Sequence, residues 1–276
     1  MDRIRLIASD MDATLLDEQS QLPADFEETI HALAELSIRF APASGRPLYT
    51  LEELFPALRD ELVFIGDNGG AIRWKGQNLF TSEMSPEGWR ALNRLTREQG
   101  DIAVLCGLES AYVERPFAVH DAVLRHFYTK IEYVDRLEDV AAPADKFTIY
   151  LPQHNAQQAY DTVYASQRSI YSVAVAGECW VDIMNPGVHK GAALQTLGQL
   201  WSLPSESIMA FGDTYNDAEM LQTVRYGFLM ENGSEPLRQK VPFLAPSHRE
   251  AGVMQVLHRV LAQNGCVCPE DFIPAH

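Results

Sequence analysis

The chain contains little cysteine and no long apolar run, and both absences exclude classes of protein. Only four of its 276 residues are cysteine, which excludes a disulfide scaffold, because such scaffolds are short and dense in cysteine. No segment approaches the ~20 consecutive apolar residues that a membrane-spanning helix needs. We therefore expect no membrane association, and because Met1-Asp2-Arg3-Ile4 lacks a signal-peptide layout, we expect a cytoplasmic protein.

Positive charge is also scarce, and this limits the partners of the protein. The chain has 22 basic and 38 acidic residues, and its formal net charge is -16. This balance argues against nucleic-acid binding, which depends on neutralising phosphates. An anionic substrate would need a local positive site, such as a metal ion, a few basic side chains or a helix N-terminus. Nothing in the sequence indicates an oligomeric state.

Two carboxylates close together near the start of the chain are its most informative feature. Asp10 and Asp12 follow an apolar run from Ile4 to Ala8, which we expect to be a buried strand. One carboxylate can attack an electrophile while the other moves a proton. Because close negative charges repel and raise each other's pKa, the pair predicts a cation nearby. We therefore expect further acids that hold a metal, and a basic residue, later in the chain.

The order of strand-like and helix-like segments predicts an α/β fold with an inserted domain. Strands and helices alternate over the first 70 residues and again from about residue 187, which predicts a doubly wound parallel sheet with right-handed crossovers. Between these regions the strands come in adjacent pairs, which favours an antiparallel sheet with helices on one face. We expect residues 1–82 and 187–276 to form the core, and residues 83–186 to form the inserted α/β domain. The tail from Asn264 shows no clear pattern.

Polar residues follow the predicted core strands at the points where these strands end. Ser44 and Arg46 follow the strand at 38–43, and Asp213 follows the strand at 208–211. Lys190 begins a predicted helix. In an open parallel sheet, ligands collect at the carboxyl ends of the strands, so these residues can meet Asp10.

These residue types fit phosphoryl transfer to an aspartate. Asp10 would attack phosphorus and form an aspartyl-phosphate, while Asp12 would protonate the leaving alcohol and then activate water. Magnesium prefers carboxylate oxygen, and it would balance the charge of the nucleophile and the phosphate. The predicted magnesium ligands are Asp10, Asp12, Asp213, Asn216 and Asp217, and the predicted phosphate-binding residues are Lys190, Ser44 and Gly45. The catalytic set is Asp10, Asp12 and Lys190.

Four motifs in this order resemble a known family. Asp10-Met11-Asp12-Ala13-Thr14, Ser44-Gly45-Arg46-Pro47, Lys190-Gly191, and Gly212-Asp213 with Asn216-Asp217 resemble the motifs of haloacid dehalogenase superfamily phosphatases. The large insert between the second and third motifs, with Asn68-Gly69 and Gly252-Val253, is similar to the Cof-type subclass. The resemblance implies a magnesium-dependent phosphatase of small phosphorylated metabolites, with an α/β cap covering the site. Arg46 and Asn68 are then candidate substrate contacts.

Two positions depart from the family pattern. Ala13 stands where the family usually has glycine, and we expect a φ that alanine can adopt, with activity retained. Glu231 stands where the subclass tends to have a small residue. It would either alter the field near the metal or face solvent.

Simpler interpretations and other functions remain open at this point. Asp10 and Asp12, or Asp213 and Asp217, would also suit helix caps or turns. In the insert, substrate contacts are a possible role for Arg115, His120, Lys146 and Trp180, although packing or surface roles explain them better. A phosphomutase of sugar phosphates is an alternative enzyme, and a non-catalytic metabolite-binding protein of the same fold is an alternative from another class.

Overall fold

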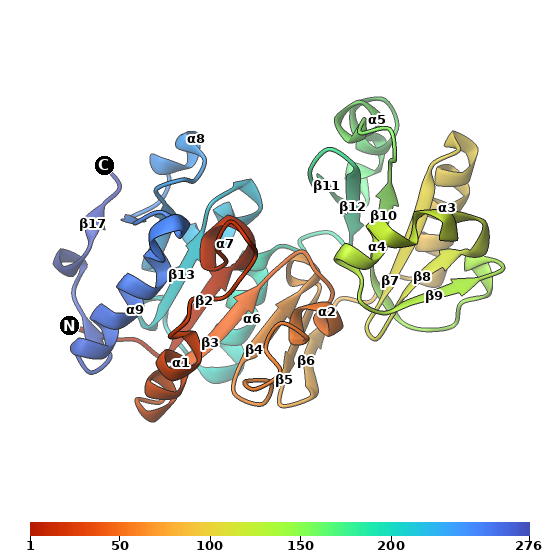
Figure 1. The fold of residues 1–276 in the computed structure, drawn as a ribbon. Coiled ribbons are helices and arrows are strands. Elements are labelled where there is room, and N and C mark those ends of the chain that lie inside the picture. The colour runs from red at the N-terminus through yellow and green to blue at the C-terminus, as the bar shows by residue number, and fades with distance from the viewer. The chain divides into compact units, whose positions relative to one another are not determined.

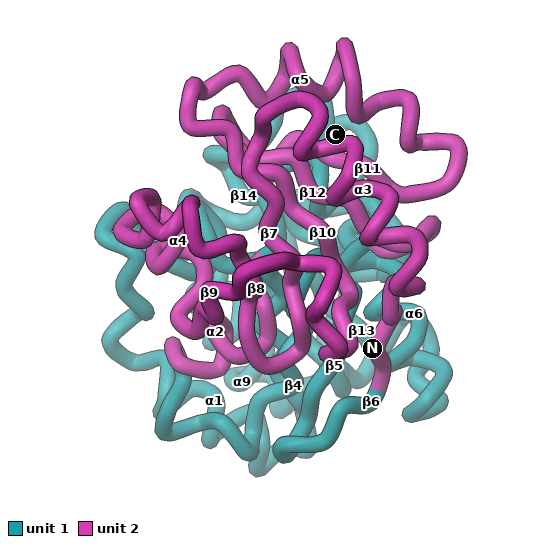
Figure 2. Tube along the Cα trace, turned by 90° about the vertical axis from the view of Figure 1, so that its right-hand side faces the viewer, with its two compact units in different colours: residues 1–45, 55–79, 189–276 teal, residues 46–54, 80–188 magenta.

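The computed structural model describes all 276 residues, which divide into two compact units (Figure 2). The first comprises residues 1–45, 55–79 and 189–276, and the second comprises residues 46–54 and 80–188. The units differ from the predicted core and insert mainly at residues 46–54. This segment joins the second unit, where the Thr50 hydroxyl accepts a hydrogen bond from the Thr129 backbone N at 3.1 Å. The assignment of the units as a catalytic core and a cap stays a prediction.

A nine-stranded sheet in the order β17-β15-β14-β13-β2-β3-β4-β5-β6 carries the first unit (Figure 1). The strands from β15 to β4 are parallel to their neighbours, which confirms the doubly wound α/β class. The bounds are β2 (Leu6–Asp10), β3 (Arg39–Ala43), β4 (Val63–Gly66), β5 (Ala71–Trp74), β6 (Gln77–Thr81), β13 (Ile208–Gly212), β14 (Tyr226–Met230), β15 (Phe243–Ala245) and β17 (Ile273–Pro274).

The strand order places a switch point at β2. The chain runs from β2 through β3 to β4 on one side, and from β13 through β14 to β15 on the other. In such a sheet the loops at the carboxyl ends of the two central strands separate, and this is where ligands bind. β2 and β13 are buried along their whole length, as expected for parallel strands covered on both faces.

Helices of the first unit bury one apolar face each. In α1 (Phe26–Glu35), Phe26, Ile30 and Leu33 are buried at helical spacing, and α1 packs against α9 (Gly252–Ala262). The helix α6 (Lys190–Trp201) packs against α7 (Ala218–Thr223). The remaining helix of this unit is α8 (Glu235–Arg238).

The second unit holds a six-stranded sheet in the order β11-β12-β10-β7-β8-β9. Its pairs are antiparallel except β8–β9, which is parallel. The bounds of its strands and helices are α2 (Leu48–Glu52), α3 (Pro86–Gln99), β7 (Ile102–Gly107), β8 (Ala111–Glu114), α4 (Asp121–Phe127), β9 (Ile131–Val134), β10 (Ala144–Tyr150), α5 (Ala156–Thr162), β11 (Ser172–Val175) and β12 (Trp180–Met184). α3 has the ends that its sequence predicts, with Ser85 accepting from the Gly88 N at 3.1 Å and Gly100 at φ 75°.

Short elements connect these parts, and some of them lie where the sequence shows no pattern. The tail after Asn264 forms β16 (Cys266–Val267), which pairs with β1 (Asp2–Arg3), and β17. The 3-10 helices are η2 (Asp67–Gly69), η3 (Arg115–His120), η4 (Leu137–Asp139), η5 (Tyr164–Ser169), η6 (Ser205–Ser207), η7 (Tyr215–Asp217), η8 (His248–Glu250) and η9 (Pro269–Asp271), and η1 (Met11–Leu15) is a π-type turn. The four cysteines form no disulfide, and none of the helices is both long enough and apolar enough to cross a bilayer.

Candidate active site

The site begins at the carboxyl end of β2. Asp10 is the last residue of this buried strand and is itself only 8% exposed. The chain then turns through η1, in which the Leu16 N donates to the Met11 carbonyl oxygen at 2.9 Å. Asp12 lies in this turn with an exposed side chain.

The expectation for Ala13 is wrong. Its φ is 60° and its ψ is 14°, which is the left-handed region that disfavours any residue with a Cβ. The turn therefore requires a conformation that glycine adopts without strain, and alanine adopts it at a cost of about 1–2 kcal/mol. Such strain persists only where neighbouring contacts hold it.

Lys190 is the cation that the acidic pair predicts. It begins α6 and is fully buried, and the side chain of the preceding His189 accepts a hydrogen bond from the Ala192 N at 3.1 Å. The Lys190 Nζ donates to the Asp10 carboxylate and, at 2.7 Å, to Oδ1 of Asp217. One ammonium group thus connects the loops after β2 and β13.

The loop after β13 holds two acids in different ways. Asp217 is fully buried, and its Oδ2 accepts from the backbone N of Asp213 at 3.0 Å and of Thr214 at 3.2 Å. A Cβ on Gly212 would lie 2.4 Å from the Cβ of Asp217, so only glycine fits there. Asp217 thereby fixes the loop and Lys190, whereas the Asp213 side chain accepts a long hydrogen bond of 3.5 Å from the Thr14 hydroxyl.

Burial and crowded charge raise the pKa values of this cluster. Burial raises the pKa of Asp10 to about 8, and Asp217 adds to the rise while Lys190 opposes it. The pKa of Asp213 rises to about 6 for the same reasons, with burial the larger cause. Burial alone would lower the pKa of Lys190, but Asp10 and Asp217 raise it above its ordinary value. The lysine stays charged, and its charge does not return the pKa of Asp10 or of Asp213 to the ordinary value.

This donor set fits magnesium. Carboxylate oxygens of Asp10, Asp213 and Asp217 lie within 4.8 Å of one another, and all three residues are buried. Hard oxygen donors of this kind are the ligands that Mg²⁺ takes in proteins. Asp12 is not a member of this group, and Oδ1 of the exposed Asn216 accepts from the Thr214 hydroxyl at 2.6 Å. Metal roles for these two residues stay predictions.

The predicted phosphate-binding loop follows β3. Ser44 is 3% exposed, and its backbone carbonyl oxygen accepts from the Asn68 N at 2.9 Å. A Cβ on Gly45 would lie 3.2 Å from Oδ1 of Asn68, so that amide packs against the loop. Gly69, at φ 99°, lies so close to α6 that a Cβ there would meet the His189 carbonyl oxygen at 2.6 Å. Asn68 and Gly69 therefore connect the loop after β3 to the helix that carries Lys190.

Sequence reasoning missed two residues next to these loops. Thr14 bonds Asp213, as described above, and Nδ2 of Asn232 donates to the Ala13 carbonyl oxygen at 2.9 Å. Thr14 is the last residue of the first motif, and Asn232 follows Glu231, whose side chain is exposed. Their only sequence signal was this adjacency.

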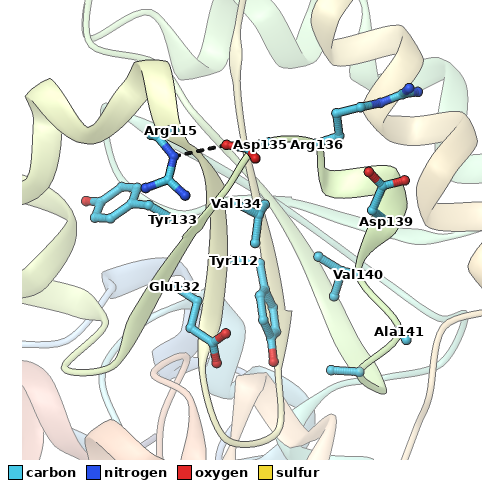
Figure 3. A pocket seen from close by; sticks show the side chains of 11 residues that line it. Tyr112, Arg115, Glu132, Tyr133, Val134, Asp135, Arg136, Asp139, Val140 and Ala141 are labelled. Atoms are coloured by element: carbon cyan, nitrogen blue, oxygen red, sulfur yellow. Dashed lines mark hydrogen bonds and ion pairs between the residues drawn. The ribbon is translucent and has the colours of Figure 1, made fainter.

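Candidate substrate contacts of the insert lie within the second unit, as does Arg46. The Lys146 Nζ is buried, 3.9 Å from Oδ2 of Asp182. The ring of His120 meets the ring of Tyr150 edge-on, with 5.4 Å between the ring centroids, and the ring of Trp180 packs on the same tyrosine with 4.6 Å between the centroids. Arg115 lies on an open groove of about 450 Å³ beside β8 and β9, where its Nε donates to Oδ1 of Asp135 at 3.0 Å (Figure 3). Its partner there is an exposed acid, which is typical of a surface ion pair.

Comparison with known proteins identifies the family. Residues 7–257 match the haloacid dehalogenase-like hydrolases. The chain is 30% identical to the 5-amino-6-(5-phospho-D-ribitylamino)uracil phosphatase YbjI of Escherichia coli K12, over 94% of this chain and 96% of that protein. It is 30% identical to an HMP-PP phosphatase of Cronobacter sakazakii, over 87% and 89%.

Solved structures agree with this assignment. The crystal structure of a protein from Streptococcus mutans UA159 superposes with a TM-score of 0.83 at 29% identity, over 94% of this chain and 99% of that one. A haloacid dehalogenase-like hydrolase from Bacteroides thetaiotaomicron shares the fold, with a TM-score of 0.82 at 22% identity over 94% and 100%. These findings confirm the predicted fold class and the predicted enzyme class, a phosphatase: the chain belongs to the haloacid dehalogenase-like hydrolase family.

Proposed function

We propose that the protein is a magnesium-dependent phosphatase of small phosphorylated metabolites that works through an aspartyl-phosphate on Asp10. The observation that carries this proposal is the buried Lys190, which bonds both Asp10 and Asp217 at the ends of β2 and β13. A buried charge of this kind costs free energy unless it is paired, and its partners here include the predicted nucleophile.

The chain's own residues have distinct roles in this reaction. An Asp10 oxygen attacks phosphorus, and the bond from phosphorus to the leaving oxygen breaks while Asp12 gives that oxygen its proton. Asp12 then takes a proton from water, which attacks phosphorus, releases inorganic phosphate and regenerates Asp10. Lys190 balances phosphate charge, and the loop at Ser44 and Gly45 donates to phosphate oxygens.

Magnesium would be held by Asp10 and Asp213, with Asp217 supporting both through Lys190 and the backbone of its loop. When bound, it supplies positive charge that offsets the charge of the phosphate and the carboxylates. This matters in a protein of net charge -16, which repels phosphorylated metabolites at long range.

The relatives suggest which substrates to test first. Their names give 5-amino-6-(5-phospho-D-ribitylamino)uracil and HMP-PP as substrates of those proteins, which supports small phosphorylated metabolites as the class for this chain. The names also favour hydrolysis over the mutase alternative. We propose that the second unit selects among such compounds, with Arg46 and Lys146 as its candidate contacts. Asn68 is a candidate contact in the first unit.

The test is release of inorganic phosphate from these two compounds, from a panel of phosphorylated metabolites and from p-nitrophenyl phosphate, with and without Mg²⁺. We expect Mg²⁺-dependent release by the wild type and none by Asp10→Asn, which keeps the size of the side chain and removes its charge. Absence of release from every compound would contradict the proposal. Conversion of one sugar phosphate into its isomer would favour the mutase.

A further inference from the structure

Asn232 bridges two segments beside the predicted general acid. Its Nδ2 donates to the Ala13 carbonyl oxygen at 2.9 Å, and its Oδ1 accepts from the His248 N at 3.0 Å. Both ends of the amide are therefore used, which fixes its orientation. The turn that carries Asn232 follows β14, which is two strands away from β2 in the sheet.

The same turn also reaches the loop that carries Asp213. The Ser234 N donates to the Asp213 carbonyl oxygen at 2.7 Å. A Cβ on Gly233 would lie 2.8 Å from that oxygen, so the residue between Asn232 and Ser234 has to be glycine for the turn to come this close. One turn thus holds both the backbone after β2 and the backbone after β13.

The peptide that Asn232 holds is the strained one. Ala13 has φ 60°, where a Cβ crowds the following carbonyl group, so the relaxed chain would leave this conformation. Asp12 directly precedes it, and a rotation of the Ala13 backbone would move the Asp12 carboxylate relative to Asp10. A hydrogen bond to the Ala13 carbonyl is the kind of contact that keeps such a conformation populated.

We propose that Asn232 is a positioning residue that holds the Asp12–Ala13 turn in its left-handed conformation and so aims Asp12 at the leaving oxygen. The inference rests on the proposed function, because it assigns Asp12 as the general acid. It follows from the alanine at position 13: with alanine there, the turn depends on the amide of Asn232, and with glycine it would depend on that amide much less.

Leaving groups of different basicity provide the test. An alkoxide needs a proton from Asp12, whereas p-nitrophenolate leaves without one, so kcat/KM for an alkyl phosphate reports the general acid and kcat/KM for p-nitrophenyl phosphate does not. We expect Asn232→Ala to lower the first about fivefold and the second less than about twofold, as the loss of one hydrogen bond predicts. Asn232→Asp should behave like Asn232→Ala, because a carboxylate accepts from His248 but cannot donate to Ala13.

Rescue by Ala13→Gly separates positioning from a general loss of structure. In the Asn232→Ala background it should return the ratio of the two kcat/KM values to within about twofold of wild type, because glycine adopts a positive φ without strain. Glu231→Gln, a neighbouring exposed residue, is the matched control and should leave the ratio unchanged. Equal losses for both substrates, or a folded double variant without rescue, would overturn the proposal.

Amide hydrogen exchange keeps this outcome separate from that of the proposed function. The Leu16 N closes the turn on Met11, so it should exchange faster in Asn232→Ala and return to the wild-type rate in the double variant. Unchanged exchange at Leu16 would refute the hold on the turn, even if the protein hydrolysed neither substrate. An inactive wild type with the expected exchange pattern would refute the phosphatase activity and the role of Asp12. It would still support the proposal that Asn232 holds the Asp12–Ala13 turn.

Discussion

Binding of magnesium should depend steeply on pH, because the ligands must first lose protons. The pKa is about 8 for Asp10 and about 6 for Asp213. Between pH 6 and pH 8, proton competition at Asp10 alone would change the affinity about 50-fold, and Asp213 would add about twofold, so the Kd should fall about 100-fold. At pH 7 about one proton should leave for each ion bound, almost all of it from Asp10.

Isothermal titration calorimetry with Mg²⁺ at pH 6, 7 and 8, in two buffers of different ionisation enthalpy, measures both quantities. Asp10→Asn removes the group with the higher pKa, so its affinity should vary only about twofold over the same range. A Kd for the wild type that does not change with pH would refute the reasoning. So would a pH dependence that survives unchanged in Asp10→Asn.

The same pKa values link metal and stability. Both acids have folded-state pKa values above the ordinary 3.8, so without metal the folded state binds more protons than the unfolded chain. The stability that these protons contribute is complete below about pH 3.8 and is lost as the pH rises through about 6 and then about 8. Mg²⁺ should therefore raise the Tm more at pH 8 than at pH 6.

Three substitutions test other parts of the site. Lys190→Met leaves buried acids without their cation, so it should abolish phosphate release. In urea titrations it should also lower the free energy of unfolding of the metal-free protein by about 3–5 kcal/mol. Stability equal to that of the wild type would contradict the pairing of Lys190 with these acids. Ala13→Gly should raise the free energy of unfolding by about 0.5–1 kcal/mol, because the relief of about 1–2 kcal/mol of backbone strain exceeds the entropic cost of glycine. A loss of stability would contradict the strain at Ala13. Gly212→Ala places a methyl group against Asp217, so kcat/KM should fall at least tenfold. Unchanged activity would count against the close approach.

Much of the fold followed from local patterns. The alternation of strand and helix predicted the parallel sheet, and Lys75 and Gly76, both at positive φ, form the turn between β5 and β6. β9 and the strands after Asn264 were missed, because β9 and β16 owe their strand conformation to partners distant in sequence. Residues 156–168 have the sequence pattern of one helix, but the chain leaves the α-helix at Val163 and continues as a 3-10 helix.

The site shows the same division between what is local and what is not. Asp10, Lys190, Asp213 and Asp217 were predicted to meet, because each follows or precedes a core strand or helix at one end of the sheet. The bonds of Thr14 and Asn232 were not predicted, because they depend on how loops fold over one another. The φ of Ala13 was predicted wrongly, because the strain of one residue is decided by contacts, such as that with Asn232, which the sequence does not display.

The proposed reaction depends above all on Asp10 as the nucleophile. Wild-type protein mixed with Mg²⁺ and substrate, quenched in acid within the first turnover and digested, should yield the Asp10 peptide with the mass of one added phosphate, and hydroxylamine treatment should remove it. Asp10→Asn should give no such adduct, and Asp12→Asn should accumulate it from p-nitrophenyl phosphate, because water is then activated poorly. Phosphate release by the wild type with no adduct on that peptide in either the wild type or Asp12→Asn would contradict the central claim.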